Sequence, residues 1–160
     1  MSLKNLIKNL FYTYFKKDSH YYFKTNKKQL NHREYIGDKW DEIGKLQFHF
    51  LRNNGLKPHH KLIDIGCGSL RGGIHFINYL DRFNYFGTDI NNDLIKLGLS
   101  NELNVELKSK VNNDNFIFSK NFNFNFKIDY FDYAVAISVF THLRKSNIII
   151  CLKNLKKKIK

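Results

Sequence analysis

The sequence predicts an α/β fold in which a parallel β-sheet carries helices on both faces. Residues 61–65 and 85–89 are short runs typical of buried parallel strands, and each is followed by a segment with helical periodicity. A third run at 131–137 is almost wholly apolar, with only Asp132 near its start. Because strands that alternate with helices usually join one parallel sheet, we expect these three runs to lie in the same sheet.

The composition is that of one folded, basic domain. The chain has 160 residues, and its 27 Lys and Arg against 14 Asp and Glu give a net charge of +13 at pH 7. Hydrophobic residues make up 42%, enough for a core, which excludes a disordered basic tail. A positive field attracts nucleic acid, anionic lipid and phosphorylated substrates alike, so the charge alone selects no partner.

Cysteine usage and hydropathy favour a cytoplasmic protein. Cys67 and Cys151 cannot form a disulfide framework and lie in no Cys/His cluster with zinc-ligand spacing, so no metal site is expected. No segment approaches the roughly 20 apolar residues of a membrane-spanning helix. Lys4 and Lys8 interrupt the N-terminus too early for a secretory signal.

Residues 1–34 are expected to form a helical extension, and residues 35–160 the α/β domain. Within the extension, residues 3–17 place apolar side chains at helical spacing with lysines on other faces, which predicts an amphipathic helix. Peripheral contact of this helix with an anionic membrane surface and packing on its own domain both remain open. Residues 18–33 lack a clear period and are interpreted as a connecting arm.

The α/β domain should begin with a helix over about residues 40–54, with Asp38 as its N-cap and a stop at Asn54 and Gly55. Its expected apolar stripe is Trp40, Ile43, Phe50 and Leu51.

Two strands and three further helices complete the expected order. The third strand should lie within residues 116–126, where aromatic and polar residues alternate, and the fourth at 131–137. One helix is expected around residues 94–103. The helix before it should direct Leu70, Ile74, Ile77 and Leu80 inward, and the last, from Ser146, should carry Ile149, Leu152, Leu155 and Ile159.

The turn at residues 64–69 is expected to bind a ligand. Gly66 and Gly68 let the backbone approach a ligand closely, and the helix that follows offers free amide donors. Asp89 ends the next strand, roughly 20 residues beyond the glycines, where its carboxylate can accept hydrogen bonds from both hydroxyls of a ribose. These features favour an adenosine-type ligand. A dinucleotide is less favoured, because the next glycine, Gly72, comes one place late for the GxGxxG pattern.

At these positions the sequence resembles the class I S-adenosylmethionine-dependent methyltransferases. The first motif of that family is similar to residues 62–68, its ribose-binding acid and the next residues to 89–91, and its strand-four motif to residues 131–143. More narrowly, three stretches are similar to a bacterial subgroup associated with the modification of glycans and cell-surface saccharides. These stretches are residues 35–37, 40–48 and 69–73.

The resemblance implies a Rossmann-like methyltransferase fold, S-adenosylmethionine as cofactor, and a hydroxyl of a saccharide or another small acceptor as target. Asp64 would orient the amino group of the donor, Asp89 would hold the ribose, Ile90 would flank the adenine, and Asn121 could hydrogen-bond it. The positions assigned to the cofactor are Asp64, Gly66, Cys67, Gly68, Asp89, Ile90, Asn121 and Ser138. Methyl transfer from a sulfonium needs no metal.

Two residues are candidates for the acceptor side. His142 follows strand four, where open α/β sheets place ligands, and could act as general base for a hydroxyl or simply cap the next helix. Arg71 could face an anionic substrate or lie in solvent. Strand four lacks the Asn/Asp-Pro-Pro-aromatic sequence of methylases that act on base amino groups, which disfavours that class but leaves other RNA methyltransferases open.

The resembling family continues beyond its last matching helix into strands five to seven, which this sequence lacks. Strand four should therefore be an exposed edge that invites self-association, and the chain is interpreted as a truncated form. Two alternatives to an active enzyme remain open. One is a non-catalytic methyltransferase remnant, and the other is a basic module that binds RNA or a membrane surface.

Overall fold

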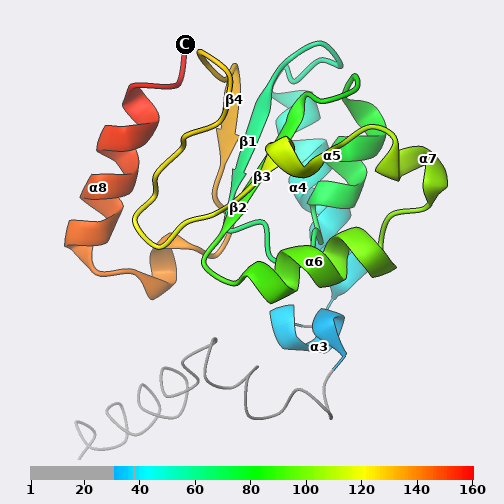
Figure 1. Ribbon diagram of the computed structural model, residues 1–160. Coiled ribbons are helices and arrows are strands. Elements are labelled where there is room, and N and C mark those ends of the chain that lie inside the picture. Colours follow the sequence, from blue (N-terminus) through cyan, green and yellow to red (C-terminus); the bar gives the residue numbers. More distant parts are fainter. Residues whose placement is uncertain (1–30, 38) are drawn as a thin grey trace, which may run out of the picture.

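Four parallel strands form the sheet, in the order β3-β2-β1-β4 (Figure 1). The computed structural model describes residues 31–37 and 39–160, so Asp38 and the expected helix at residues 3–17 lie outside the described residues. The strands are β1 (Leu62–Ile65), β2 (Tyr85–Asp89), β3 (Phe116–Phe118) and β4 (Tyr133–Val135). Their parallel pairing confirms the predicted fold class.

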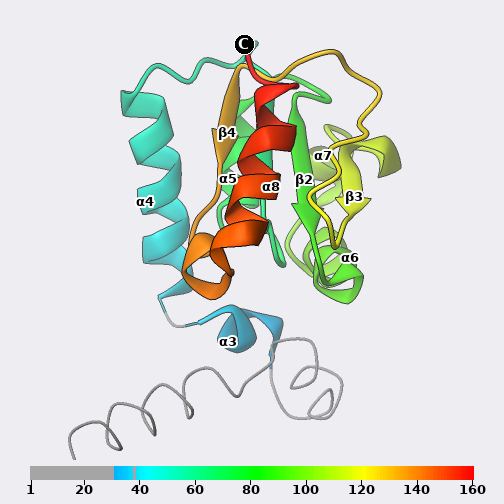
Figure 2. The ribbon, with the colours of Figure 1, turned by 90° about the vertical axis from the view of Figure 1, so that its left-hand side faces the viewer.

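Helices cover both faces of the sheet (Figures 1 and 2). On one face, α8 lies alone among the described helices, and the others lie on the opposite face or at the lower edge of the sheet in Figure 1. The helices are α3 (His32–Ile36), α4 (Trp40–Asn53), α5 (Gly73–Tyr79), α6 (Asn92–Asn101), α7 (Val105–Lys108) and α8 (Lys145–Lys156). Among the described residues, none of these helices has the length and apolar character needed to cross a membrane.

The core divides into two layers because β1 is buried on both sides. Leu62 packs into the layer that α4 to α7 cover, whereas Ile63 and Ile65 pack into the layer beneath α8. This division follows from the alternation of side chains along a strand. The second layer is largely aromatic, with Phe86 in edge-on contact with Phe131 at 5.4 Å between ring centroids.

The faces that two helices bury differ from the expected stripes. On α4, Phe50 is 63% exposed, and Gly44 and Leu51 are the buried residues. On α8, Ile149 and Leu152 are exposed and Cys151 is buried instead, whereas Leu155 and Ile159 of the expected stripe do pack against the core. Both helices contain more apolar residues than one face can hold, so packing against the sheet rather than periodicity decides which side turns inward.

Two element boundaries also differ from the expectation. The N-cap of α4 is Lys39, with a left-handed backbone (φ 60°) and no side-chain cap, where Asp38 was expected. The helix after the glycine turn begins only at Gly73, but Leu70 and Leu80, just outside it, are still buried. Helix α3 spans His32–Ile36, and the division of the chain between residues 34 and 35 stays a prediction.

Strand β4 is an edge of the sheet within the described residues, and its outer side is paired only at the start. The backbone N–H of Phe131 donates to the carbonyl of Lys158 at 2.6 Å, and the N–H of Lys160 donates to the carbonyl of Phe131 at 3.1 Å. These bonds make a parallel bridge between Phe131 and Ile159. Self-association through the rest of this edge stays a prediction.

The loop between β1 and α5 is held between two helical glycines. A Cβ on Gly98 of α6 would lie 2.6 Å from the backbone of Ser69, and one on Gly44 of α4 would collide with the carbonyl oxygen of Arg71. Both helices therefore pack against the loop backbone more closely than any other residue would allow. This approach fixes the path of the chain between residues 69 and 71.

We expect Gly98→Ala to lower the free energy of unfolding by about 2 kcal/mol, because the added methyl group overpacks the contact with Ser69. Helix propensity alone would predict the opposite sign, a gain of up to about 1 kcal/mol. Urea unfolding measures the difference, with Lys96→Ala on the exposed side of the same helix as the control. Equal stability of the two variants would contradict the close approach.

Candidate functional site

The predicted glycine turn lies at the carboxyl ends of β1 and β2. Gly66 and Gly68 have φ values of 75° and 53°, in the region that favours glycine. The N–H groups of Gly66 and Cys67 donate to the carbonyl of Thr88 at 2.7 and 3.1 Å. The chain bends sharply here because two glycines permit the backbone conformation and the Thr88 carbonyl of β2 accepts the N–H groups of the turn.

Asp89 ties the turn to the start of α6. One carboxylate oxygen accepts the N–H of Gly68 at 2.8 Å, and the other accepts the N–H of Asn91 at 2.7 Å. Burial raises the pKa of Asp89, while the backbone donors of Asn91, Gly68 and Ile90 oppose that rise. Each oxygen keeps a lone pair, so the carboxylate is oriented and still able to accept further hydroxyl donors.

Asp64 is a buried acid on β1. It accepts a hydrogen bond from the hydroxyl of Tyr85 at 2.8 Å. Burial raises its pKa to about 7, and the negative charge of Asp89 adds to this rise, whereas the Tyr85 hydrogen bond and the positive charge of Arg71 oppose it. A carboxyl group with one hydrogen bond in such a place is costly for the fold, which is typical of functional sites.

Arg71 is half-buried beside this acid, so the structure does not place it freely in solvent. Its Nε atom is buried and has no hydrogen-bond partner in the part of the chain that the structure describes. Burial lowers its pKa, and the attraction of Asp64 opposes that shift. A Cβ on Gly37 would lie 3.9 Å from its Nη1 atom, so the guanidinium lies next to the end of α3.

Two apolar side chains border the glycine turn. A Cβ on Gly68 would lie 2.7 Å from Cδ1 of Ile36, and one on Gly66 would collide with the side chain of Val139. Ile36 belongs to α3 and Val139 to the segment after β4. The turn is therefore bordered by segments from opposite ends of the described chain.

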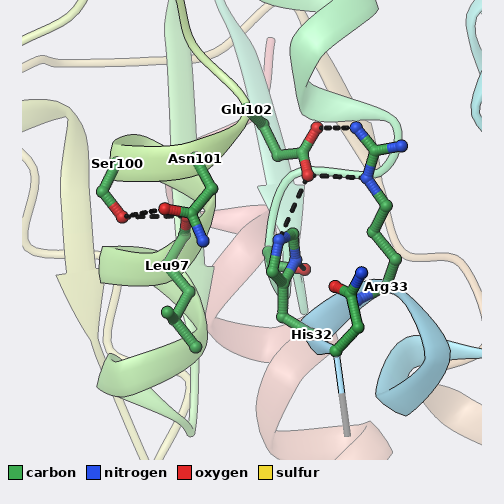
Figure 3. Close-up of polar contacts among 8 residues, drawn as sticks. His32, Arg33, Leu97, Ser100, Asn101 and Glu102 are labelled. Carbon is green, nitrogen blue, oxygen red and sulfur yellow. Dashed lines mark hydrogen bonds and ion pairs between the residues drawn. The ribbon is translucent and has the colours of Figure 1, made fainter.

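A polar cluster fastens α3 to the turn (Figure 3). Arg33 donates to both carboxylate oxygens of Glu102, at 2.8 and 2.6 Å. His32 lies between Glu102, at 3.2 Å from its Nε2, and the hydroxyl of Ser69, at 3.1 Å from its Nδ1. Burial lowers the pKa of His32, the charge of Glu102 opposes this shift, and that of Arg33 adds to it.

Sequence reasoning missed this cluster, because residues 18–33 were interpreted as a connecting arm. The local signal was Asn31, whose side chain accepts the N–H of Arg33 at 3.1 Å and caps α3. Asn91 was also missed as a functional candidate. Its Nδ2 is buried with no hydrogen-bond partner among the described residues, although its oxygen caps α6.

The structure brings Asp64, Gly66, Cys67, Gly68 and Asp89 together at the turn. Cys67 is buried, its Sγ lies against Gly87 of β2, and burial raises the pKa of its thiol well above the usual range. A protonated, buried thiol packs the turn and is no nucleophile.

The remaining predicted residues, Ile90, Asn121, Ser138 and His142, are exposed. Ile90 is 51% exposed just beyond Asp89. Ser138 has a left-handed backbone (φ 58°), and His142 ends the 3₁₀ helix Phe140–His142. Asn121 lies beyond β3. Among the described residues, the side chains of His142 and Asn121 form no hydrogen bond, so their assigned roles stay predictions.

Within residues 31–37 and 39–160, no group of three or more His, Cys, Asp or Glu side chains could hold a metal ion. The chemistry available to the described residues at the turn is therefore that of oriented carboxylates, an unpaired guanidinium NH and backbone amides.

Comparison with known proteins connects this geometry to a family. Residues 63–160, more than half of the chain, match the profile of a family described as a methyltransferase domain. No curated protein sequence matches the chain.

Solved structures with the same fold are distant in sequence. Magnesium protoporphyrin IX methyltransferase from Synechocystis PCC 6803, solved with S-adenosylmethionine, is 13% identical with a TM-score of 0.60, and the match covers 99% of this chain and 73% of that one. Phosphoethanolamine N-methyltransferase 1 from Haemonchus contortus, solved with phosphoethanolamine and S-adenosylhomocysteine, is 14% identical with a TM-score of 0.63, covering 92% and 30%. YcgJ from Bacillus subtilis is 15% identical with a TM-score of 0.58, covering 72% and 47%.

We expect Asp64 to make the stability of the protein fall as the pH rises. Its pKa is about 7 in the folded chain, against an ordinary value of 3.8. The folded protein therefore retains a proton that the unfolded chain releases between about pH 4 and 7, and the free energy of unfolding should fall by up to about 4 kcal/mol across this range. Asp64→Asn cannot ionise, yet it keeps an acceptor for Tyr85, so it should lack this decrease.

Urea unfolding at pH 5 and pH 8 tests this expectation. Asp64→Asn should gain stability relative to the wild type between the two pH values, whereas Asp81→Asn, at an exposed position, should follow the wild type. The same pH dependence in all three proteins would show that Asp64 does not hold a proton in the fold.

Proposed function

The chain belongs to the methyltransferase domain family, and from that premise we propose that it transfers a methyl group from S-adenosylmethionine to a hydroxyl of a saccharide or another small acceptor. The observation that carries the proposal is the hydrogen bond between the Gly68 backbone and the Asp89 carboxylate at the carboxyl edge of the sheet. It places a turn with two glycines next to an oriented acid, an arrangement that suits a nucleoside ligand.

The residues at the turn fit S-adenosylmethionine. Asp89 offers acceptor oxygens to ribose hydroxyls, and Asp64 offers a buried carboxyl group whose ionised form an ammonium group would stabilise. The Nε of Arg71 is a buried donor with no partner in the described part of the chain, and an anionic group would be a suitable partner. Gly66 and Gly68 leave the backbone open to close approach.

When bound, S-adenosylmethionine supplies an electrophilic methyl group on a sulfonium centre. The side chains of this protein would bind the donor, align its methyl group with the acceptor and exclude water. Asp89 is held at both oxygens by backbone amides, so it binds without reorganisation. Ile36 and Val139 border the turn with apolar surface and reduce the access of water.

His142 is the residue we assign to the acceptor hydroxyl. It lies exposed in the segment that follows β4, three residues after Val139, which borders the turn. Its imidazole would accept the proton that the hydroxyl loses as its oxygen attacks the methyl carbon. This role needs one ring nitrogen that is free to accept a proton, and both ring nitrogens of His142 are without a hydrogen-bond partner among the described residues.

The saccharide acceptor rests on the three stretches that resemble the glycan-modifying subgroup. These stretches contact one another beside the turn. Gly44 packs against the backbone of Arg71, Gln47 lies against Gly72, and the end of α3 lies next to Arg71. Their packing into one wall supports a shared role in shaping the acceptor side.

Asp89→Ala should abolish measurable binding of S-adenosylmethionine and S-adenosylhomocysteine, because it removes the ribose acceptor and the hydrogen bond that holds the Gly68 backbone to the end of β2. Calorimetric titration of the purified chain measures the affinity, and Asp81→Ala is the matched control at an exposed acid. Full binding by a folded Asp89→Ala variant would contradict the assigned site.

His142→Gln should lower the rate of methyl transfer by about 100-fold or more and leave the affinity for S-adenosylmethionine unchanged. Transfer of radiolabelled methyl groups to a panel of mono- and oligosaccharides measures the rate, with Thr141→Ala as the neighbouring control. A wild-type chain that binds the donor but methylates no saccharide would contradict the proposed acceptor. Equal rates in the wild type and His142→Gln would exclude His142 as the base.

A further inference from the structure

Helix α8 presents apolar side chains on its outer face. Ile149, Ile150 and Leu152 are 42%, 44% and 49% exposed, whereas Cys151 is fully buried against the sheet. Figure 2 shows this helix in front of the sheet, with its outer side toward the viewer. These exposed side chains therefore do not belong to the face of α8 that packs on the sheet.

The same helix and its flanks carry only positive charge. Residues 144–160 contain seven Lys and Arg and no Asp or Glu, which is more than half of the net charge of the whole chain. Lys158 and Lys160 are engaged locally, with the carbonyl of Ile128 and with Asp132. Within the described chain no ion pair forms at the other five, which are Arg144, Lys145, Lys153, Lys156 and Lys157.

The segment beside α8 extends this surface. Asn154 of α8 donates to the carbonyl of Phe122, which fixes residues 119–131 next to the helix. Lys120 and Lys127 are exposed there. Lys127 pairs with Asp114, and Asp129 is the exposed acid of this segment, so the combined surface remains strongly positive.

We propose that the outer face of α8 docks on an anionic membrane surface. A helix with aliphatic side chains flanked by lysines inserts the aliphatic groups at the boundary between headgroups and acyl chains, while the lysines contact the lipid phosphates. Ile149 and Ile150 supply the first component, and Lys153 and Lys156 supply the second.

Two other occupants fit less well. An RNA strand would satisfy the lysines, but single-stranded nucleic acid stacks its bases on aromatic rings, and the exposed apolar side chains of α8 are aliphatic. The exposed ring in the neighbouring segment, Tyr130, already lies against the Lys160 ammonium group at 3.8 Å. A second copy packed face to face would bring its own lysines against these, with no acid on the helix to pair them.

The location of α8 relates the proposed docking to the proposed function. The helix begins at Lys145, three residues after His142, so the docking face adjoins the segment assigned to the acceptor. A membrane-bound chain would therefore hold its acceptor side close to the lipid surface. The acceptors concentrated there would be molecules with a lipid anchor.

Sedimentation with vesicles tests the docking in the full chain. Vesicles of phosphatidylcholine with one quarter phosphatidylglycerol should bind the protein, and phosphatidylcholine alone should not. The double variants Ile149→Ser/Ile150→Ser and Lys153→Gln/Lys156→Gln should each reduce the bound fraction at least about fivefold. The control Leu46→Ser/Phe50→Ser changes two side chains of α4 that are 64% and 63% exposed and should bind as the wild type does.

A local probe separates α8 from residues 3–17, for which membrane contact was predicted from the sequence. A fluorophore sensitive to polarity, attached to Ile150→Cys, should shift to shorter wavelength with anionic vesicles, while the same fluorophore on Leu46→Cys should not. The native Cys67 and Cys151 are buried and will not compete for the label. Far-UV circular dichroism and urea unfolding show that each variant is folded, independently of donor binding.

Three results would overturn the proposal. The first is vesicle binding that neither α8 double variant reduces. The second is tight binding of single-stranded RNA that the lysine variant abolishes and the isoleucine variant keeps, without vesicle binding. The third is a dimer in sedimentation velocity that the isoleucine variant dissociates, again without vesicle binding.

Discussion

The hydrogen bond from the Gly68 backbone to the Asp89 carboxylate is the constraint on which the site depends. It spans 21 residues of sequence and joins the ends of the two central strands. The same carboxylate accepts the N–H of Asn91, so one acid fixes the glycine turn, the end of β2 and the start of α6. A nucleoside that binds Asp89 is therefore held by a group that the backbone has already oriented, and binding needs little reorganisation.

Around this bond, the fold retains groups that do not stabilise it. Asp64 is buried with an elevated pKa, and the buried Nε of Arg71 and Nδ2 of Asn91 have no hydrogen-bond partner among the residues that the structure describes. Apolar side chains at these positions would cost the fold less free energy than buried polar groups without partners. All three lie within a few residues of the glycine turn or of Asp89. This clustering supports the proposal that a ligand binds here and interacts with these groups.

Local patterns in the sequence predicted the sheet, the glycine turn and Asp89. These predictions used properties of short segments, namely strand hydrophobicity, the conformational freedom of glycine and the spacing to the next acid. The structure contains the corresponding strand pairing and positive φ angles. The contact between Arg33 and Glu102 was beyond such reasoning, because its partners are 69 residues apart and neither lies in a motif. The exposed face of α8 was also missed, because periodicity cannot choose between two apolar sides of one helix.

The strand order has a consequence for how the chain folds during synthesis. Tyr85 on β2 bonds Asp64 on β1 across 21 residues, whereas Lys61 next to β1 bonds Asp132 before β4 across 71. Closing the longer loop costs more entropy, and residue 132 leaves the ribosome much later, so β1 pairs with β2 first. Until β4 has been synthesised, the edge of β1 that β4 will cover is unpaired. We expect the nascent chain to be most prone to aggregation in this interval.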